Sequence, residues 1–215
     1  MSEFTPATGR LFAELIARNF AEDEVSVVEG DASVAHAFSL LPFDHLLFTG
    51  STPVGHHVMR AASENLTPVT LELGGKSPAI IGEAANFDKA VERIIVGKTL
   101  NAGQTCIAPD YVLLPAGREQ EFVDTARRVL ARCYPDIRNT PDYTNIINER
   151  HFARLRGYVD EARERGAEIV ELAPGAAADS ASRRLPPLVL RGVNESMRVM
   201  QDEIFGPLLP LIPYR

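Results

Sequence analysis

The sequence predicts an α/β fold in which strands alternate with helices and pair into mostly parallel sheets. Two observations lead to this prediction. Short apolar or β-branched runs recur along the chain, and most are followed by apolar residues at helical spacing. The loops between these segments are short, as they are in βαβ units. A chain of 215 residues is long enough for one to two domains, and we expect a boundary near residues 73 and 74.

The first unit, residues 1–73, begins with a predicted helix. Thr5-Pro6 is typical of a helix start because proline fits the first helical position, and the apolar residues that follow recur at helical spacing. The turn at Glu29-Gly30-Asp31 separates a β-branched run from the next helical pattern. The predicted helices of this unit are 6–20, 33–41 and 54–64, and the predicted strands are 25–28, 45–48 and 68–73.

The second unit, residues 74–215, repeats the alternation of strands and helices. Residues 174–184 are rich in Ala and Ser and are expected to form a surface loop. The predicted strands are 79–81, 111–114, 169–170, 188–190 and 208–212, and the predicted helices are 87–102, 119–133 and 149–165.

Composition excludes several classes of protein. Acidic residues number 29 against 22 basic ones, and a net charge of −7 argues against a nucleic-acid partner. No apolar run approaches about 18 residues, so no membrane span is expected. The first residues show no secretory signal, and we expect a cytoplasmic protein. The two cysteines are far apart and the five histidines have no metal-ligand spacing, so neither a disulfide framework nor a metal site is expected.

The segment Gly50-Ser51-Thr52-Pro53-Val54-Gly55 joins a predicted buried strand to a helix. The N-terminus of a helix offers unpaired N–H groups and the positive end of the helix dipole, and phosphate binds readily there. Gly50 permits close approach of a ligand to the backbone, Ser51 offers a hydroxyl, and Gly55 lets the helix pack closely. A helix start with no ligand remains the alternative, because the motif matches neither the usual dinucleotide fingerprint nor a P-loop.

Cys106 follows a predicted apolar-faced helix and precedes Ile107-Ala108-Pro109, which must leave that helix. A thiol in such a loop can reach a ligand, and its thiolate is a strong nucleophile. A buried packing cysteine is the alternative, and Cys133, on an amphipathic helix, is assigned to that class.

Glu72 lies near the end of the strand Val69–Leu73, in which polar and apolar residues alternate. A carboxylate at a strand end can be partly desolvated and act as a general base. The alternative is a solvated glutamate or one paired with Lys76.

Four motifs occur in an order that identifies a family. They are Phe48–Thr52, Leu71–Pro78, Gly103–Cys106 and Glu203–Pro207. In these motifs the chain resembles the aldehyde dehydrogenase superfamily, and the likeness extends over the whole chain. Gln104–Leu113 is most similar to the class 3-like branch, and Phe43–Ala79 to bacterial coniferyl aldehyde dehydrogenases. The resemblance implies that residues 1–73 are the C-terminal part of a Rossmann-like NAD(P)-binding domain. It also implies that residues 74–215 are the N-terminal part of the catalytic domain.

The resemblance also implies a reaction and its residues. Cys106 is the nucleophile that attacks an aromatic, coniferyl-like or long-chain aldehyde, and the thiohemiacetal gives a hydride to NAD or NADP. Glu72 then activates water, which hydrolyses the thioester to the acid. The other implied roles concern the dinucleotide: Gly50, Ser51, Thr52 and Gly55 at the pyrophosphate, Glu3 at the adenosine ribose, Glu203 at the nicotinamide ribose, and Phe205 near the nicotinamide.

The chain departs from the family in length, since a full member is roughly twice as long. We therefore expect a central fragment that lacks an oxyanion-hole asparagine and has weak or no activity alone. Full-length members are homo-oligomers, with a dimer expected for this branch. Two alternatives stay open: a non-catalytic domain that keeps only the fold, and a CoA-acylating semialdehyde dehydrogenase, against which Glu72 argues.

Overall fold

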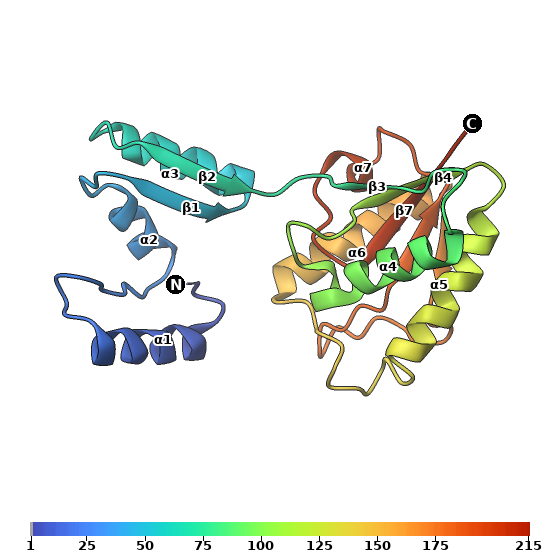
Figure 1. Ribbon diagram of the computed structural model, residues 1–215, viewed down its shortest axis with the longest axis horizontal. Coiled ribbons are helices and arrows are strands. Elements are labelled where there is room, and N and C mark those ends of the chain that lie inside the picture. The colour runs from blue at the N-terminus through green and yellow to red at the C-terminus, as the bar shows by residue number, and fades with distance from the viewer. Residues whose placement is uncertain (1) are drawn as a thin grey trace. The chain divides into compact units, whose positions relative to one another are not determined.

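The computed structural model describes residues 2–215 and shows two compact units (Figure 1). The first unit extends to Gly74, and the second comprises Gly75–Arg215. Both mix helices with parallel strands, as the sequence predicts. No helix among residues 2–215 is long and apolar enough to cross a membrane.

The first unit contains one βαβ element. Its two strands pair in parallel, with Leu46 opposite Val69 and Gly50 opposite Leu73. The connecting helix packs against both strands, which is the compact way to link parallel neighbours. The elements in chain order are α1 (Pro6–Asn19), α2 (Ala32–Ser39), β1 (Leu46–Gly50), α3 (Thr52–Ser63) and β2 (Val69–Leu73).

The strand predicted at residues 25–28 is wrong. The structure assigns no strand there, and the described sheet of this unit consists of β1 and β2. The N–H of Val25 instead closes a turn by donating to the carbonyl oxygen of Ala21 at 3.1 Å. A β-branched run favours extended backbone, but a strand also needs a ladder of hydrogen bonds with a neighbour.

The second unit is built on a five-stranded sheet with the order β3-β4-β7-β6-β5. Four strands are parallel, and β5 pairs antiparallel with β6 at the edge. The strands are β3 (Pro78–Ile80), β4 (Tyr111–Pro115), β5 (Glu168–Glu171), β6 (Leu188–Arg191) and β7 (Leu208–Tyr214). The helices are α4 (Phe87–Thr99), η1 (Leu100–Gly103, a 3₁₀ turn), α5 (Glu119–Cys133), α6 (Glu149–Glu164) and α7 (Arg198–Gln201).

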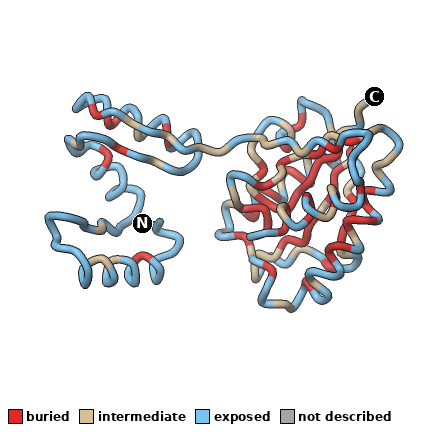
Figure 2. The backbone as a smooth tube through the Cα atoms, in the orientation of Figure 1, coloured by how far each residue is buried: buried red, intermediate tan, exposed pale blue. Residues whose placement is uncertain are grey.

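Both faces of this sheet are covered. Every residue from Leu208 to Leu211 in β7 is buried, whereas a strand with one solvated face would alternate. In Figure 1, α4 lies in front of the sheet and α6 behind it. Figure 2 shows buried backbone concentrated along these strands and helices.

Side-chain caps explain where two helices of this unit begin. Asn86 accepts a hydrogen bond from the N–H of Lys89 at 3.1 Å at the start of α4. Asn148 does the same for His151 at 2.9 Å at the start of α6. Each cap satisfies an N–H group that the helix itself leaves unpaired, so it fixes the first turn.

The helix predicted over residues 87–102 is too long at its C-terminus. The α-helix ends at Thr99, and Asn101 and Ala102 have φ values of 50° and 52°. The left-handed region is unfavourable for a residue such as alanine and must be held by its surroundings. Ala102 is fully buried, so packing holds this turn directly before the segment that carries Cys106.

Candidate active site

The predicted phosphate turn lies between β1 and α3. β1 ends at Gly50, Ser51 precedes the helix, and α3 begins at Thr52, two residues earlier than predicted. The Ser51 side chain makes no capping hydrogen bond, and its carbonyl oxygen accepts from the N–H of Gly55 at 2.9 Å. The hydroxyl is therefore not used to cap the helix, and the first N–H groups of α3 form the positive end of its dipole.

The two glycines of this turn have close side-chain neighbours. Gly55 is buried, and a Cβ added there would lie 2.9 Å from Cδ2 of Leu73 on β2. A Cβ at Gly50 would lie 2.5 Å from Cζ of the Phe48 ring. The close approach of α3 to the strands is thus the predicted role of Gly55.

Glu72 shares one end of the small sheet with this turn. It pairs in register with Thr49, the residue before Gly50. Because the carboxyl ends of parallel strands meet at one edge, Glu72 and Gly50 lie on neighbouring strands at that edge. Glu72 is exposed, so its own unit does not desolvate it. Glu3 is also exposed, in the turn that precedes α1.

Cys106 lies in an irregular segment after η1, and its side chain is exposed. Gln104, two residues before it, is buried and holds the segment with three hydrogen bonds. Its amide nitrogen donates to the carbonyl oxygens of Asn101 at 3.0 Å and Asn145 at 3.2 Å, and its amide oxygen accepts from the N–H of Ile147 at 3.0 Å. An exposed thiol on a fixed segment can reach a ligand. The exposure of Cys106 excludes the alternative of a buried packing cysteine.

Cys133 is exposed as well, at the last residue of α5. The prediction that it is a packing residue is therefore wrong. The buried face of α5 includes Phe122, Ala126 and Val129. Cys133 lies one turn beyond the end of that face.

The segment that carries Glu203 lies against the segment that carries Cys106. Gly103 has φ 73°, and a Cβ added there would lie 2.4 Å from the carbonyl oxygen of Gly206. Only glycine allows the two backbones to approach so closely. Phe205 has φ 46°, which is strained for a residue with a side chain. The second unit thus brings Gly103, three residues before Cys106, into backbone contact with Gly206, the residue after Phe205.

Charged side chains hold the backbone near the contact between Gly103 and Gly206. The sequence reasoning did not identify them. Asp110 is 3% exposed; its Oδ1 accepts from the N–H of Ile204 at 3.0 Å, and its Oδ2 accepts from Nζ of Lys76 at 2.6 Å. Lys76 also donates to the carbonyl oxygens of Val199 at 2.8 Å and Asp202 at 3.1 Å. Lys76 therefore pairs with Asp110, and the alternative in which it pairs with Glu72 is wrong.

Lys98 is the fully buried cation of this cluster. It is 1% exposed, and its Nζ has no hydrogen-bond partner within residues 2–215. Burial holds the pKa of Lys98 at about 8, while Asp110 acts in the opposite direction and Lys76 adds to the lowering. A signal was present in the sequence, because Lys98 continues the buried stripe of Val91, Ile94 and Ile95 at helical spacing.

The carboxylate of Glu203 is half-buried beside these groups. Burial raises its pKa, and a hydrogen bond from the backbone of Gly75 together with the charge of Arg154 opposes that change. Arg154 of α6 donates to the carbonyl oxygens of Glu203 at 3.3 Å and Ile204 at 2.9 Å. A carboxylate held in this way can accept hydrogen bonds from sugar hydroxyls.

The predicted residues therefore fall into two groups. Gly50, Ser51, Thr52, Gly55 and Glu72 gather at one end of the first unit, and Cys106, Glu203 and Phe205 gather in the second. Within residues 2–215, no cluster of three or more His, Cys, Asp or Glu side chains could hold a metal ion.

Comparison with known proteins identifies the family and the fold of the chain. The model of the aldehyde dehydrogenase family matches residues 1–215. A probable coniferyl aldehyde dehydrogenase of Pseudomonas aeruginosa is 61% identical over 214 residues, which is 100% of this chain and 44% of that protein. The structure of a substrate-bound AldH of Staphylococcus aureus is 41% identical to this chain, with a TM-score of 0.90. The match covers 100% of this chain and 46% of the AldH chain.

A third relative was solved with ligands. A mutant of AldC from Pseudomonas syringae, in complex with NAD+ and octanal, is 30% identical with a TM-score of 0.83. It covers 99% of this chain and 45% of that chain. The chain thus spans less than half the length of the relatives that it matches.

Proposed function

The chain belongs to the aldehyde dehydrogenase family, and from that premise we propose that it carries the nucleophile and the base for NAD(P)-dependent oxidation of an aldehyde. The observation that supports this most directly is the exposed thiol of Cys106 on a segment fixed by Gln104. A positioned thiolate is the nucleophile that covalent oxidation of a carbonyl carbon requires.

In this proposal the sulfur of Cys106 forms a bond to the aldehyde carbon. The backbone N–H of Cys106 is the group that we assign to stabilise the oxyanion that develops. Once that carbon has been oxidised, Cys106 holds the acyl group as a thioester. The carboxylate of Glu72 then takes a proton from the water that hydrolyses the thioester, and the acid is released.

Each unit carries residues that suit one part of a nicotinamide dinucleotide. Ser51 keeps its hydroxyl free of capping at the start of α3, and Gly55 lets that helix approach β2. We assign the pyrophosphate to Gly50, Ser51, Thr52 and Gly55, the adenosine ribose to Glu3, and the nicotinamide ribose and ring to Glu203 and Phe205. NAD+ or NADP+, when bound, accepts the hydride that leaves the aldehyde carbon.

Two relatives bear on the aldehyde itself. The 61% identical relative is named a probable coniferyl aldehyde dehydrogenase, so an aromatic, coniferyl-like aldehyde is our first choice. AldC was solved with octanal, which makes a long-chain aliphatic aldehyde the second. The two aldehydes differ in the apolar surface that a binding pocket would bury, and such differences change affinity several-fold. Rates with coniferyl aldehyde and octanal therefore separate these choices.

The proposal also assigns a domain role to each unit of the chain. Residues 1–73 supply part of the NAD(P)-binding domain, and residues 74–215 supply part of the catalytic domain. The free cysteines Cys106 and Cys133 suit a reducing compartment, so we propose the cytoplasm as the location. A homodimer of the protein that contains this chain is the proposed assembly, which light scattering tests.

Formation of NAD(P)H by the purified chain, followed by absorbance, tests the proposed activity. We expect a weak rate with coniferyl aldehyde that Cys106→Ala lowers by at least about a thousandfold, because loss of a nucleophile removes the covalent route. Cys133→Ala is the matched control and keeps the rate. Equal inactivity of the unaltered chain and Cys106→Ala contradicts catalysis by this chain and favours a non-catalytic domain. A rate that depends on coenzyme A favours the acylating alternative.

A further inference from the structure

One face of α6 holds the segment that leads to Glu203. Tyr158, Glu161 and Arg165 recur three and four residues apart, so they lie on one side of the helix. Their side chains reach the segment between Asn194 and Asp202, which contains only the four-residue helix α7. We call these three residues the α6 clamp.

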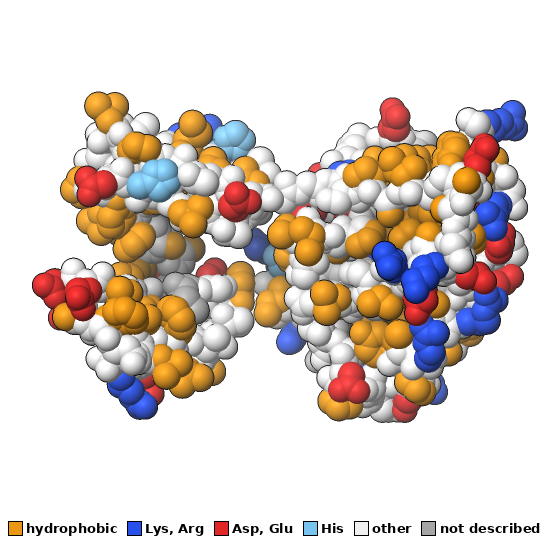
Figure 3. All heavy atoms as spheres, viewed as in Figure 1, with side chains coloured by type: hydrophobic (Ala, Val, Ile, Leu, Met, Phe, Trp, Pro, Cys, Tyr) orange, Lys and Arg blue, Asp and Glu red, His pale blue; other side chains and the backbone are white. Residues whose placement is uncertain are grey.

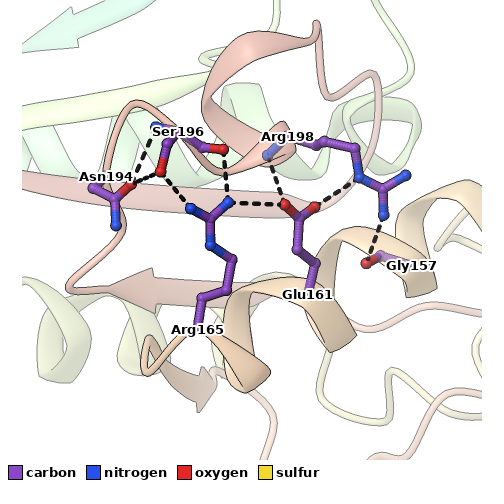
Figure 4. A network of polar contacts seen from close by, with 6 residues as sticks. All are labelled: Gly157, Glu161, Arg165, Asn194, Ser196 and Arg198. Carbon is purple, nitrogen blue, oxygen red and sulfur yellow. Dashed lines mark hydrogen bonds and ion pairs between the residues drawn. The ribbon is translucent and has the colours of Figure 1, made fainter.

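Glu161 is the centre of the clamp. Its carboxylate accepts from Nε of Arg198 at 2.7 Å and from Nη1 of Arg165 at 3.2 Å (Figure 4). The hydrogen bond from Arg198 holds the pKa of Glu161 below its ordinary value, so the carboxylate is charged at neutral pH. The Glu161 side chain is 21% exposed, and solvent screens this pair less than a fully exposed one.

The other two residues extend the clamp in both directions. Arg165 donates to the carbonyl oxygen of Ser196 at 2.7 Å and to the Ser196 hydroxyl, while that hydroxyl also bonds Asn194. Tyr158 donates from its hydroxyl to Oδ2 of Asp202 at 2.9 Å. The clamp therefore holds the segment from Ser196 to the residue that directly precedes Glu203.

The end of this segment needs external support. Phe205 has φ 46°, a conformation that costs of the order of a few kcal/mol and that persists only where neighbours fix it. α6 also packs there directly, because a Cβ at Gly206 would lie 2.5 Å from Cδ2 of Leu155. Beyond Gly206, the same backbone contacts Gly103 next to the Cys106 segment.

We propose that the α6 clamp positions the carboxylate of Glu203 toward the ribose of the bound dinucleotide. Tyr158, Glu161 and Arg165 are then positioning residues, because they act through side chains and backbone of residues 196–202. The proposal rests on the proposed function, since Glu203 is assigned to the nicotinamide ribose there. It predicts that a broken clamp weakens dinucleotide binding more than it slows the chemical step.

Glu161→Ala tests the clamp, with Asp160→Asn as the matched control. Asp160 lies on the same helix and pairs with Arg163 at 3.2 Å, away from the clamped segment. Two measurements are made on both variants: hydrogen exchange of residues 196–204, and the KM values for NAD(P)+ and aldehyde together with kcat. Glu161→Gln keeps the shape of the side chain and one acceptor, so it should restore part of any loss.

We expect exchange of residues 196–204 to become about five- to tenfold faster in Glu161→Ala, as for the loss of one or two hydrogen bonds. The KM for NAD(P)+ should rise about three- to tenfold, with kcat and the aldehyde KM within about twofold. Asp160→Asn should change neither measurement. Tyr158→Phe, which removes one hydroxyl, should raise exchange at residue 202 and give a smaller effect of the same kind.

Three results would overturn the clamp. One is exchange in Glu161→Ala equal to that in Asp160→Asn. Another is faster exchange with equal losses in kcat and in both KM values, which marks a general structural role. If Glu161→Ala unfolds, Tyr158→Phe takes its place. The third overturning result is then unchanged hydrogen exchange at residue 202 in Tyr158→Phe. If the unaltered chain reduces no NAD(P)+, the proposed activity fails, and the dissociation constant for NAD(P)+ then replaces the KM beside hydrogen exchange, with an unchanged constant in Glu161→Ala overturning the clamp.

Discussion

The two units of the chain bury their apolar residues to very different degrees. The second unit closes a core in which Phe122, Leu155 and Leu190 are fully buried. In the first unit, the apolar residues of α1 at helical spacing stay exposed, with Leu11 58% and Phe12 45% accessible. Figure 3 shows hydrophobic side chains across the visible surface of this unit. A helix gains stability mainly by burying its apolar face, so the second unit carries most of the stability of the chain.

The difference extends to the candidate site. In the second unit, buried charges and hydrogen bonds fix the backbone beside Cys106 and Glu203. In the first unit, the proposed ligand groups are a helix start and the exposed Glu72. The geometry of the thiol region is therefore set within residues 75–215, and the dinucleotide turn depends on a small sheet of two strands.

The largest expected effect compares two phenylalanines. Phe122→Ala in α5 should lower the free energy of unfolding by about 3–5 kcal/mol, because it leaves a cavity in a closed core. Phe12→Ala in α1 should change it by less than about 1 kcal/mol, because that ring already contacts solvent. Urea denaturation of both variants measures the contrast, and equal losses would show that α1 is as well packed as α5.

The next effect uses the buried amine of Lys98. Burial holds its pKa at about 8, below its ordinary value of 10.5. Between these values the unfolded chain binds more protons than the folded one, so stability rises with pH from about 8 to 10.5. Lys98→Met removes this penalty and should stabilise the second unit at pH 7 by up to about 3 kcal/mol.

The pH dependence separates this cause from packing. The advantage of Lys98→Met should shrink as the pH is raised from 7 to 9.5, measured by urea denaturation at each pH. Asp110, Lys76 and Glu203 face the amine and are unchanged in the variant. A difference that stays constant with pH would mean that the amine is neutral throughout or that the shape of Met is responsible.

The smallest effect compares two glycines with close neighbours. A Cβ at Gly206 meets the fully buried Leu155, so Gly206→Ala should cost about 1–3 kcal/mol. A Cβ at Gly55 meets the half-buried Leu73, which has room to move, and alanine improves the helix by up to about 1 kcal/mol. Gly55→Ala should therefore be nearly neutral. Thermal unfolding ranks the two, and a larger loss at Gly55 would mean that the first unit is the more rigid.

The sequence predicts the elements whose cause is local. Helix starts at Asn86 and Asn148 have caps in the sequence, and the alternation of Val69–Leu73 corresponds to β2. The early end of α4 was not predictable, because the left-handed Asn101 and Ala102 are held by distant packing.

The site follows the same rule. Motif residues such as Ser51 and Cys106 are visible in the sequence because each lies in a short pattern. The groups that fix the segment of Glu203 are not visible in this way, since Asp110 contacts Ile204 and Lys76 across 94 and 34 positions of the chain. For Lys98 a signal was available and was not used, because it continues the apolar stripe of α4.

The central claim is that Cys106 forms a covalent acyl intermediate that Glu72 resolves. Mass spectrometry of Glu72→Gln, quenched after mixing with NAD(P)+ and coniferyl aldehyde, tests it most directly. The account predicts a feruloyl group on the peptide that contains Cys106 and none on the peptide that contains Cys133, because loss of the base slows hydrolysis of the thioester. Absence of the adduct on Cys106, or equal labelling of both cysteines, would contradict it.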